Sequence, residues 1–358
     1  MTRVSALCGV VLGVAAAAQQ PPPDQQQAQK AWNENERGLN ASFRGDQTEA
    51  ERLYRDAMTI WKQLGPAYEG HLATTEANLA DVLALEGRRR DAAKLLDDAV
   101  TLFRHSVGYH HPSTITALTT LAGIYLMMGQ TTIAQTYFEE ALPLARQYTP
   151  DGVQMARVLV GLSVIKLRTQ KAEEALPLGE ESLRAAIKSS GEDSMDTALA
   201  YLAVAEVHRV TNHPERAMPL FRKARSIYEH ILGPEHLRVA VVLSQEGLIL
   251  LDDGKVSLAE KEMTRALDIV RNHFPNAKPE LFVVETNLAL VRMKQGKYSD
   301  AERLLTTAIA REEREPVSSV ADVAGALNTL ASIREKQRMY DEAARLHKRA
   351  DAMLSFSN

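Results

Sequence analysis

The sequence repeats itself about every 42 residues, and this period constrains the fold more than any other feature. The segments 78–99, 120–141 and 287–308 align without gaps, and each has Leu-Ala near its start and a glycine seven residues after that alanine. The frame recurs eight times, and the residue at the place of that glycine, here named the turn residue, is in turn Gly45, Gly87, Gly129, Gln170, Asn212, Gly254, Gly296 and Arg338. Successive turn residues are 41 or 42 residues apart. Self-similarity at such a period indicates stacked units, so the sequence predicts a solenoid.

Small side chains occupy three columns of the repeat. Five residues after the turn residue every copy has alanine, and twelve residues after it seven copies have alanine and one has Ser182. Seven residues before the turn residue every copy has glycine, alanine or serine. A spacing of seven is about two turns of α-helix, and small residues on two facing helices let their backbones approach closely. Each copy is therefore predicted to be an antiparallel helix pair, which makes the chain all-α with about eight pairs.

The turn residue is predicted to end the first helix of each pair. Glycine and asparagine favour the left-handed conformation that closes a helix, whereas glutamine and arginine do not. Looser turns are therefore expected at Gln170 and Arg338. Pro143 lies deep in its predicted second helix, where the missing N–H and the ring disfavour continuation. That helix is expected to bend or to stop early.

The N-terminal segment differs from the rest of the chain. Arg3 is the only charge before Ala18, and an apolar run is followed by four alanines. This pattern predicts a secretory signal peptide, residues 1–18, whose apolar core is too short to span a bilayer. The single cysteine, Cys8, lies inside it after Leu7, which is larger than the residue that a bacterial lipobox places there, so a lipid anchor is not expected. The mature protein is expected to be secreted or periplasmic, in a bacterium, with no membrane span.

Composition and the remaining segments define the expected domain organisation. Residues 19–30 are rich in proline and glutamine and are predicted to be a linker, residues 31–354 hold the repeat array, and residues 355–358 are a short tail. The net charge of −4 shows no basic excess, so no nucleic-acid partner is expected.

The repeat resembles a known family, the tetratricopeptide repeats. The segments YHHPSTITALTTLAGIY, residues 109–125, and LGPEHLRVA, residues 232–240, carry His-Pro or Gly-Pro between copies. Together with the 42-residue period, this connection is similar to that of the kinesin-light-chain subclass. The resemblance covers roughly residues 30–354. It implies a right-handed α-solenoid, a superhelix whose concave groove receives an extended peptide or a helix of a partner protein.

One face of each first helix is predicted to line that groove. At about 100° per residue, the positions 13, 9, 6 and 2 before the turn residue lie opposite the face that packs on the second helix. This face is named the inner stripe, and its candidate partner-binding residues are Asn78, Gln245, Leu248, Asn287, Leu290, Lys294 and Lys336. The amides could hydrogen-bond a peptide backbone, the leucines offer apolar pockets and the lysines could meet a carboxylate. The resemblance implies main-chain contacts for the two asparagines. The alternatives are that a tight superhelix buries the stripe as core, and that the lysines are only solvated.

The sequence shows no catalytic or metal-binding motif. His105, His110 and His111 form the densest histidine group, but no cysteine or carboxylate stands near them at ligand spacing. The Gly-Lys pairs that begin at Gly254 and Gly296 lack the upstream glycine of a phosphate loop and coincide with the turn between helices. We therefore expect no enzymatic activity, no cofactor and no metal.

The predicted function is that of a non-catalytic scaffold or adaptor that binds a peptide or protein partner in the concave groove. One alternative is a self-assembling structural protein of the envelope without a peptide groove, whose size in solution would depend on concentration. A homo-oligomer is compatible with either. A third alternative is an enzyme with a clustered His/Glu site, which would need a thermal shift that depends on metal or substrate.

Overall fold

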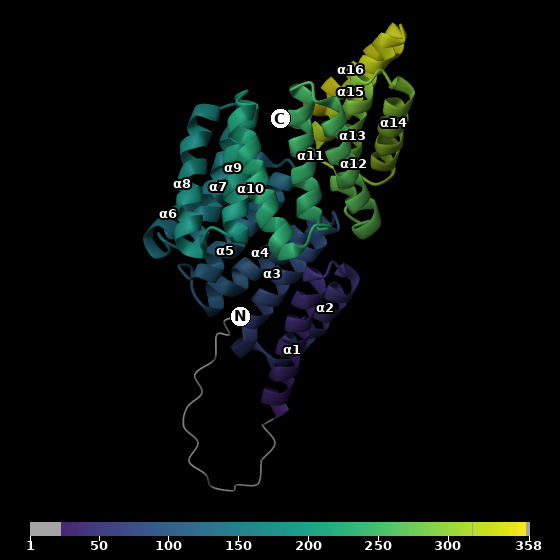
Figure 1. Ribbon diagram of the computed structural model, residues 1–358. Coiled ribbons are helices and arrows are strands. Elements are labelled where there is room, and N and C mark those ends of the chain that lie inside the picture. The colour runs from purple at the N-terminus through teal and green to yellow at the C-terminus, as the bar shows by residue number, and fades with distance from the viewer. Residues whose placement is uncertain (1–22, 317, 356–358) are drawn as a thin grey trace, which may run out of the picture.

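A computed structural model describes residues 23–316 and 318–355 of the chain (Figure 1). The predicted signal peptide, the first part of the predicted linker and the end of the predicted tail lie outside the described residues. Within the described part, no helix combines the length and the apolar character that crossing a membrane requires.

The described residues fold entirely into helices and connecting turns. In chain order the helices are α1 (Pro23–Phe43), α2 (Gln47–Leu64), the short 3-10 helix η1 (Pro66–Tyr68), α3 (Glu69–Leu85), α4 (Arg89–Ser106), α5 (Pro112–Met127), α6 (Thr131–Tyr148), α7 (Val153–Arg168), α8 (Ala172–Ser190), α9 (Met195–Val210), α10 (Pro214–Leu232), α11 (Leu237–Asp252), α12 (Val256–His273), α13 (Lys278–Lys294), α14 (Tyr298–Arg314), α15 (Val320–Lys336) and α16 (Tyr340–Ser355). Odd-numbered helices are the first helices of the repeat and even-numbered helices are the second. The predicted all-α solenoid of eight helix pairs is therefore confirmed.

The small-residue columns bring the two helices of a pair into close contact. A side-chain carbon added at Gly38 of α1 would lie 2.8 Å from Cε1 of Tyr54 on α2, and one added at Gly247 of α11 would lie 2.7 Å from Cγ of Met263 on α12. Ordinary van der Waals contacts between carbons need about 3.5 Å or more. A side chain at Gly38 or Gly247 would therefore require Tyr54 or Met263 to shift.

All eight turn residues adopt the same left-handed turn. Gln170, Asn212 and Arg338 have φ values of 60°, 60° and 64°, close to those of the glycines in the other copies. The N–H of the residue after Gln170 donates to the carbonyl of Lys166 over 2.8 Å, and the N–H after Arg338 donates to the carbonyl of Arg334 over 2.8 Å. The expectation of looser turns at Gln170 and Arg338 was wrong, because these bonds and the packing of the pair impose the conformation on any side chain.

Three helices differ in extent from the sequence prediction. Helix α1 begins at Pro23 and takes in most of the predicted linker, since proline is well tolerated at a first helical position and Ala28 already packs on the core. Helix α6 does not stop early: it continues through Pro143 to Tyr148, because Pro143 faces solvent while Leu144 and Ala145 are buried. Helix α16 also takes in Ser355, the first residue of the predicted tail.

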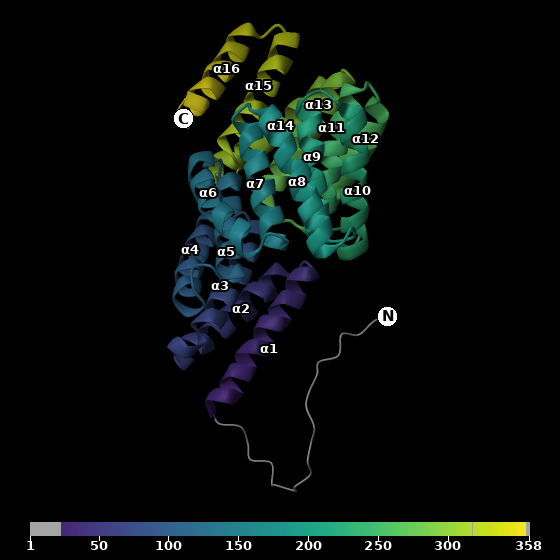
Figure 2. The same ribbon diagram turned by 90° about the vertical axis from the view of Figure 1, so that its left-hand side faces the viewer.

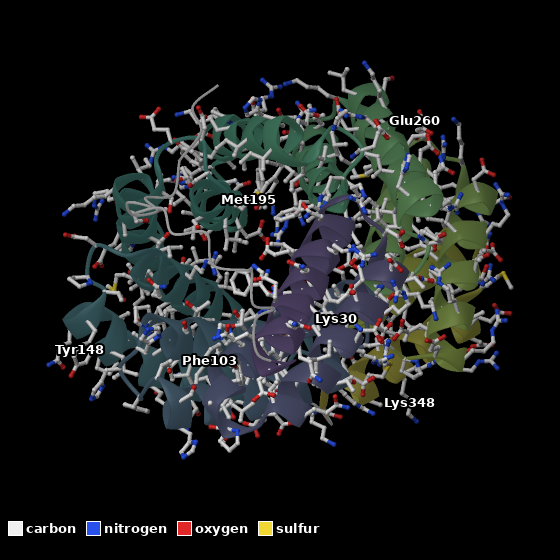
Figure 3. The ribbon with its side chains drawn as sticks, turned by 90° about the horizontal axis from the view of Figure 1, so that it is seen from below. Lys30, Phe103, Tyr148, Met195, Glu260 and Lys348 are labelled. Carbon is white, nitrogen blue, oxygen red and sulfur yellow. The ribbon has the colours of Figure 1, made fainter. Side chains whose placement is uncertain are left out.

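The pairs wind into a superhelix. Viewed from below, Phe103, Tyr148, Met195, Glu260 and Lys348 follow one another around the rim, so the chain travels around most of a circle (Figure 3). From the side, α1 and α2 lie at one end of the molecule and α15 and α16 at the other (Figures 1 and 2). The chain therefore rises as it turns, which lets early copies lie below late ones.

Candidate functional site

The inner stripe is partly exposed along the superhelix. From the second copy to the eighth, only Gly161 and Ala203 of this stripe are buried, and the other stripe residues are half-buried or exposed. Met127, Val210 and Val241 stay 38%, 52% and 37% exposed although they are large and apolar. The stripe thus forms an accessible surface, named here the inner face.

The two candidate asparagines both connect neighbouring copies. Asn78 on α3 donates its side-chain N–H to Oδ1 of Asn35 on α1 over 3.1 Å. Asn287 on α13 donates its side-chain N–H to Oγ of Ser244 on α11 over 2.9 Å. Each asparagine is half-buried on the inner face, where one amide can hold two copies together and still present polar atoms to a ligand.

The other candidate residues lie on three successive first helices, α11, α13 and α15. Gln245 and Leu248 lie half-buried on α11, Leu290 lies half-buried on α13, and the exposed Lys294 ends α13. Lys336 is exposed at the end of α15. The structure therefore brings Gln245, Leu248, Asn287, Leu290 and Lys294 onto neighbouring first helices, whereas Asn78 lies on α3, near the other end of the chain.

Gln245 carries an enclosed polar atom. Its Oε1 is covered by protein and has no hydrogen-bond partner among the described residues. Leaving an enclosed acceptor without a donor costs about 1–3 kcal/mol. A donor that reached this oxygen from the inner face would recover that free energy.

Charged residues that the candidate set left out also shape the inner face. Water reaches the side chain of Asp81 on α3, yet enough protein surrounds the carboxyl group that desolvation raises its pKa, against the opposing effect of Arg238 and Arg157. Arg157 on α7 donates from Nε to Oδ1 of Asp196 on α9 over 2.6 Å. Arg238 lies at the start of α11. Asp81 of the second copy is therefore subject to the charge of Arg238 of the sixth copy. The sequence signal was available, because Asp196 and Arg238 stand 16 positions before their turn residues and extend the inner stripe by one helical turn.

The histidines named in the sequence have local roles. His111 accepts the N–H of Ser113 at the start of α5 over 3.2 Å, and His110 stacks on Tyr148 with 4.4 Å between ring centroids. The imidazole of His105 contacts Glu69 over 2.5 Å, which raises the pKa of the histidine. Within residues 23–316 and 318–355, no three His, Cys, Asp or Glu side chains come together as a metal site would require.

Comparisons with known proteins agree with the repeat. The tetratricopeptide-repeat family model matches residues 71–147, 154–230 and 286–357. The chain is 22% identical over 221 residues to Protein KINESIN LIGHT CHAIN-RELATED 2 of Arabidopsis thaliana, covering 61% of this chain and 33% of that protein. It is 29% identical over 162 residues to the Clustered mitochondria protein homolog of Candida albicans, covering 44% of this chain and 12% of that protein. The chain thus spans a third or less of the length of these relatives.

Solved structures share the superhelix at low sequence identity. A Rap protein complexed with Competence and Sporulation Factor superimposes with a TM-score of 0.73 at 14% identity, covering 95% of this chain and 89% of that one. NprR in complex with its cognate peptide NprX gives 0.67 at 14% identity, covering 94% and 89%. The apo form of NprR from B. thuringiensis gives 0.59 at 14% identity, covering 90% and 87%.

Proposed function

Because the chain belongs to the tetratricopeptide-repeat family, we propose that it is a non-catalytic interaction protein that binds an extended peptide segment of a partner on its inner face. The observation that carries this proposal is the exposure of Met127, Val210 and Val241 on that face. The three side chains lie on three different helices but belong to the same inner stripe, so their exposed apolar surface is available to one extended partner.

The chemistry of α11 and α13 fits a peptide in extended conformation. Leu248 and Leu290 offer apolar contacts, and Gln245 and Asn287 offer amide groups that can pair with a peptide main chain. Lys294 ends the same helix as Asn287 and can meet an acidic side chain or a terminal carboxylate of the ligand.

The likeness to peptide complexes supports the same proposal. NprR bound to its cognate peptide superimposes on this chain with a higher TM-score than apo NprR does, 0.67 against 0.59. The superhelix described here therefore has a shape closer to the form of NprR that holds a peptide. We extend to this chain only the class of ligand, a peptide, and no particular sequence.

The proposal includes export from the cytoplasm. Residues 1–18 have the composition of a cleavable signal peptide, and the protein would then act in the periplasm or outside the cell. Mass spectrometry of the protein purified from its own organism tests this directly. A mature N-terminus at about Gln19 supports export, and an intact N-terminus contradicts it.

The experiment that tests the proposed function is affinity capture from an envelope extract of the source organism, followed by mass spectrometry. The bait is the full chain, compared with a variant carrying Asn287→Asp and Leu290→Glu on α13. The matched control carries Asn272→Asp and Leu258→Glu, the same changes at exposed positions of α12. A partner retained by the parent and the control but lost by the α13 variant supports the inner face as the binding site. Equal retention by all three baits contradicts it.

The ends of the superhelix favour a second candidate function, self-assembly. Tyr340 is 65% exposed at the start of α16, in the last copy, and Trp32 and Phe43 are exposed at inner-stripe positions of α1, in the first copy. Exposed apolar side chains in the first and last copies are available for contacts between two molecules. Light scattering of the purified protein over a range of concentrations tests this, because a constant monomer mass contradicts assembly.

A further inference from the structure

The first copies of the superhelix lie directly against the last ones. A side-chain carbon added at Gly45, in the turn between α1 and α2, would lie 3.5 Å from Cε1 of Phe274, which follows α12. Leu85 at the end of α3 packs against the buried cluster formed by α9 to α13. Nη2 of Arg89, at the start of α4, lies 3.7 Å from Oε1 of Glu280 on α13. These contacts join copies three to five apart and are named here the seam.

The ion pair at the centre of the seam is largely withdrawn from water. The Arg89 and Glu280 side chains are 10% and 19% exposed. Desolvation lowers the pKa of Arg89 and raises that of Glu280, and each partner opposes the shift of the other. Arg89 also donates from Nη1 to the carbonyl of Met127, at the end of α5, over 3.1 Å. A partial separation of the two turns would part the two charges before water could hydrate them, so the seam favours either full contact or full separation.

A second set of charges lies further along the same seam. Arg168 ends α7 and donates from Nη1 to the carbonyl of Leu126 over 2.7 Å. Its pKa is lowered by desolvation and raised by Asp322 of α15. Asp322 also acts electrostatically on Arg89. Arg89 and Arg168 belong to the first turn of the superhelix. They act electrostatically on Glu280 and Asp322, which lie at the N-terminal ends of α13 and α15.

The seam and the inner face share residues. Asp81, Met127 and Arg168 belong to the inner stripe, and Asp81 and Arg168 interact electrostatically with Arg238 of α11 and Asp322 of α15. Val241, in the first turn of α11, lies one helical turn after Arg238 on the same stripe. A ligand on the inner face would therefore meet the charges that hold the two turns together.

We propose that the seam is a two-state clasp that regulates access to the inner face. In the closed state small molecules reach the inner face but bulky ones do not, and in the open state both reach it. The link to peptide binding rests on the proposed function. The clasp itself does not, because its opening can be measured without a ligand. The two turns separate as units because packed interfaces have discrete arrangements rather than continuous ones.

The test is the accessibility of a cysteine on the inner face. The full chain has one cysteine, Cys8, so a Cys8→Ser background allows single thiols to be placed at will. Val241→Cys places one thiol on the inner face, and Leu258→Cys places a reference thiol at an exposed position of α12. Each variant is reacted with N-ethylmaleimide and with a maleimide that carries a long polyethylene glycol chain. The quantity measured is the ratio of the bulky to the small reagent's rate at each position.

In the closed clasp this ratio is expected to be lower at position 241 than at position 258. Arg89→Glu should raise the ratio at position 241 on the order of tenfold or more, because it sets two carboxylates against each other, and should leave position 258 unchanged. Adding Glu280→Arg to Arg89→Glu should return the ratio toward the parent value. Arg90→Glu, an exposed charge change on the next residue of α4, is the matched control and should change neither ratio.

Equal ratios at the two positions in the parent, or no change on Arg89→Glu, would overturn the clasp. If circular dichroism shows that Arg89→Glu does not fold, Glu280→Gln takes its place, because the neutral amide keeps the shape of the side chain. An unchanged ratio with Glu280→Gln likewise overturns the proposal. Equal retention of partners by all three capture baits, together with a clasp that opens as expected, would count against the proposed function alone.

Discussion

The two halves of the superhelix use the same inner positions in different ways. Two inner positions are compared, the residue 13 positions before a turn residue and the residue 16 positions before the next turn residue. Three such pairs, which begin in the first, third and fourth copies, are in contact: Trp32 with His71, Thr116 with Gln154, and Arg157 with Asp196. In the three pairs that follow, the first residue is apolar and the second is charged: Leu199 and Arg238, Val241 and Glu280, and Val283 and Asp322.

The difference shows where each half directs its charges. Asp196 is held by Arg157 of the neighbouring copy over 2.6 Å, so its charge stays within one turn of the superhelix. Glu280 lies 3.7 Å from Arg89, five copies earlier, so its charge acts between two turns of the superhelix. The Arg157–Asp196 pair thus connects one copy to the next, whereas the Arg89–Glu280 pair connects one superhelical turn to the other. Four predictions test this contrast, in order of decreasing effect.

Glu280→Ala should lower the free energy of unfolding by about 3–5 kcal/mol, since it removes the carboxylate that faces the largely buried guanidinium of Arg89. Urea denaturation followed by circular dichroism measures the effect. Replacing both residues, with Arg89→Met and Glu280→Leu, should recover most of the loss because an apolar pair needs no solvation. A change within about 0.5 kcal/mol for Glu280→Ala would show that the cross-turn pair does not support the fold.

The buried glutamates Glu76 and Glu285 occupy the same repeat position in the two halves. Glu285 contacts Arg271 over 2.8 Å and also Arg311, whereas Glu76 has only Lys62 at 3.8 Å, and desolvation raises the pKa of Glu76 to about 7. The folded protein then binds the carboxyl proton of Glu76 more tightly than the unfolded protein does. The free energy of unfolding therefore falls by about 3 kcal/mol as pH rises from below 4.5 to above 7.

Glu76→Gln should therefore stabilise the protein above pH 7 and have little effect below pH 4.5. Glu285→Gln should destabilise it above pH 7, because it removes the charge that two arginines contact. The urea midpoints of the parent and of each variant, measured across this pH range, test both expectations. A Glu76→Gln midpoint that follows the parent at every pH would contradict the assignment.

Asp196→Ala should cost about 1 kcal/mol, less than Glu280→Ala, because Arg157 is 37% exposed and water replaces part of the lost pair. A double-mutant cycle with Arg157→Ala isolates the pair. The coupling should be confined to the two neighbouring copies, so the Arg89→Glu effect on thiol access should be the same with and without Asp196→Ala. A large change in that effect would mean that the local pair also controls the seam.

Gln170→Gly should raise the free energy of unfolding by about 0.5–1 kcal/mol, since glycine adopts φ near 60° without the strain of a side chain. Gly254→Gln, the reverse change at a turn residue of the C-terminal half with φ 75°, should lower it by a similar amount. Thermal denaturation of both variants provides the measurement. Effects of the same sign would show that the two turns are not equivalent.

The helix pairs could be predicted because their cause is local. Small residues at fixed spacing and a glycine or asparagine at the turn define a pair within about forty residues, as Gly38, Gly247 and Asn212 illustrate. The wrong expectations arose where packing overrides local preference. Arg338 takes the strained turn because Met339 bonds back to Arg334 and the pair packs around it, and α6 passes Pro143 because Leu144 and Ala145 are held in the core.

For the candidate site, the sequence could predict which helix face the residues share but not their contacts. Helical periodicity placed Gln245, Leu248, Asn287 and Leu290 on adjacent inner positions, which is a property of each helix alone. It could not show that Asn78 and Asn287 each bond to the preceding copy, or that Oε1 of Gln245 is enclosed, because these depend on how tightly neighbouring copies pack.

By itself the sequence determined the period, the helix pairs and the inner stripe of this protein, because each arises from residues close together in the chain. Only the tertiary structure decided that Arg89 meets Glu280 and that Asp81 lies in the field of Arg238. The reason is geometric: small rotations between successive copies add up along the solenoid, and their sum sets which copies meet after a full turn.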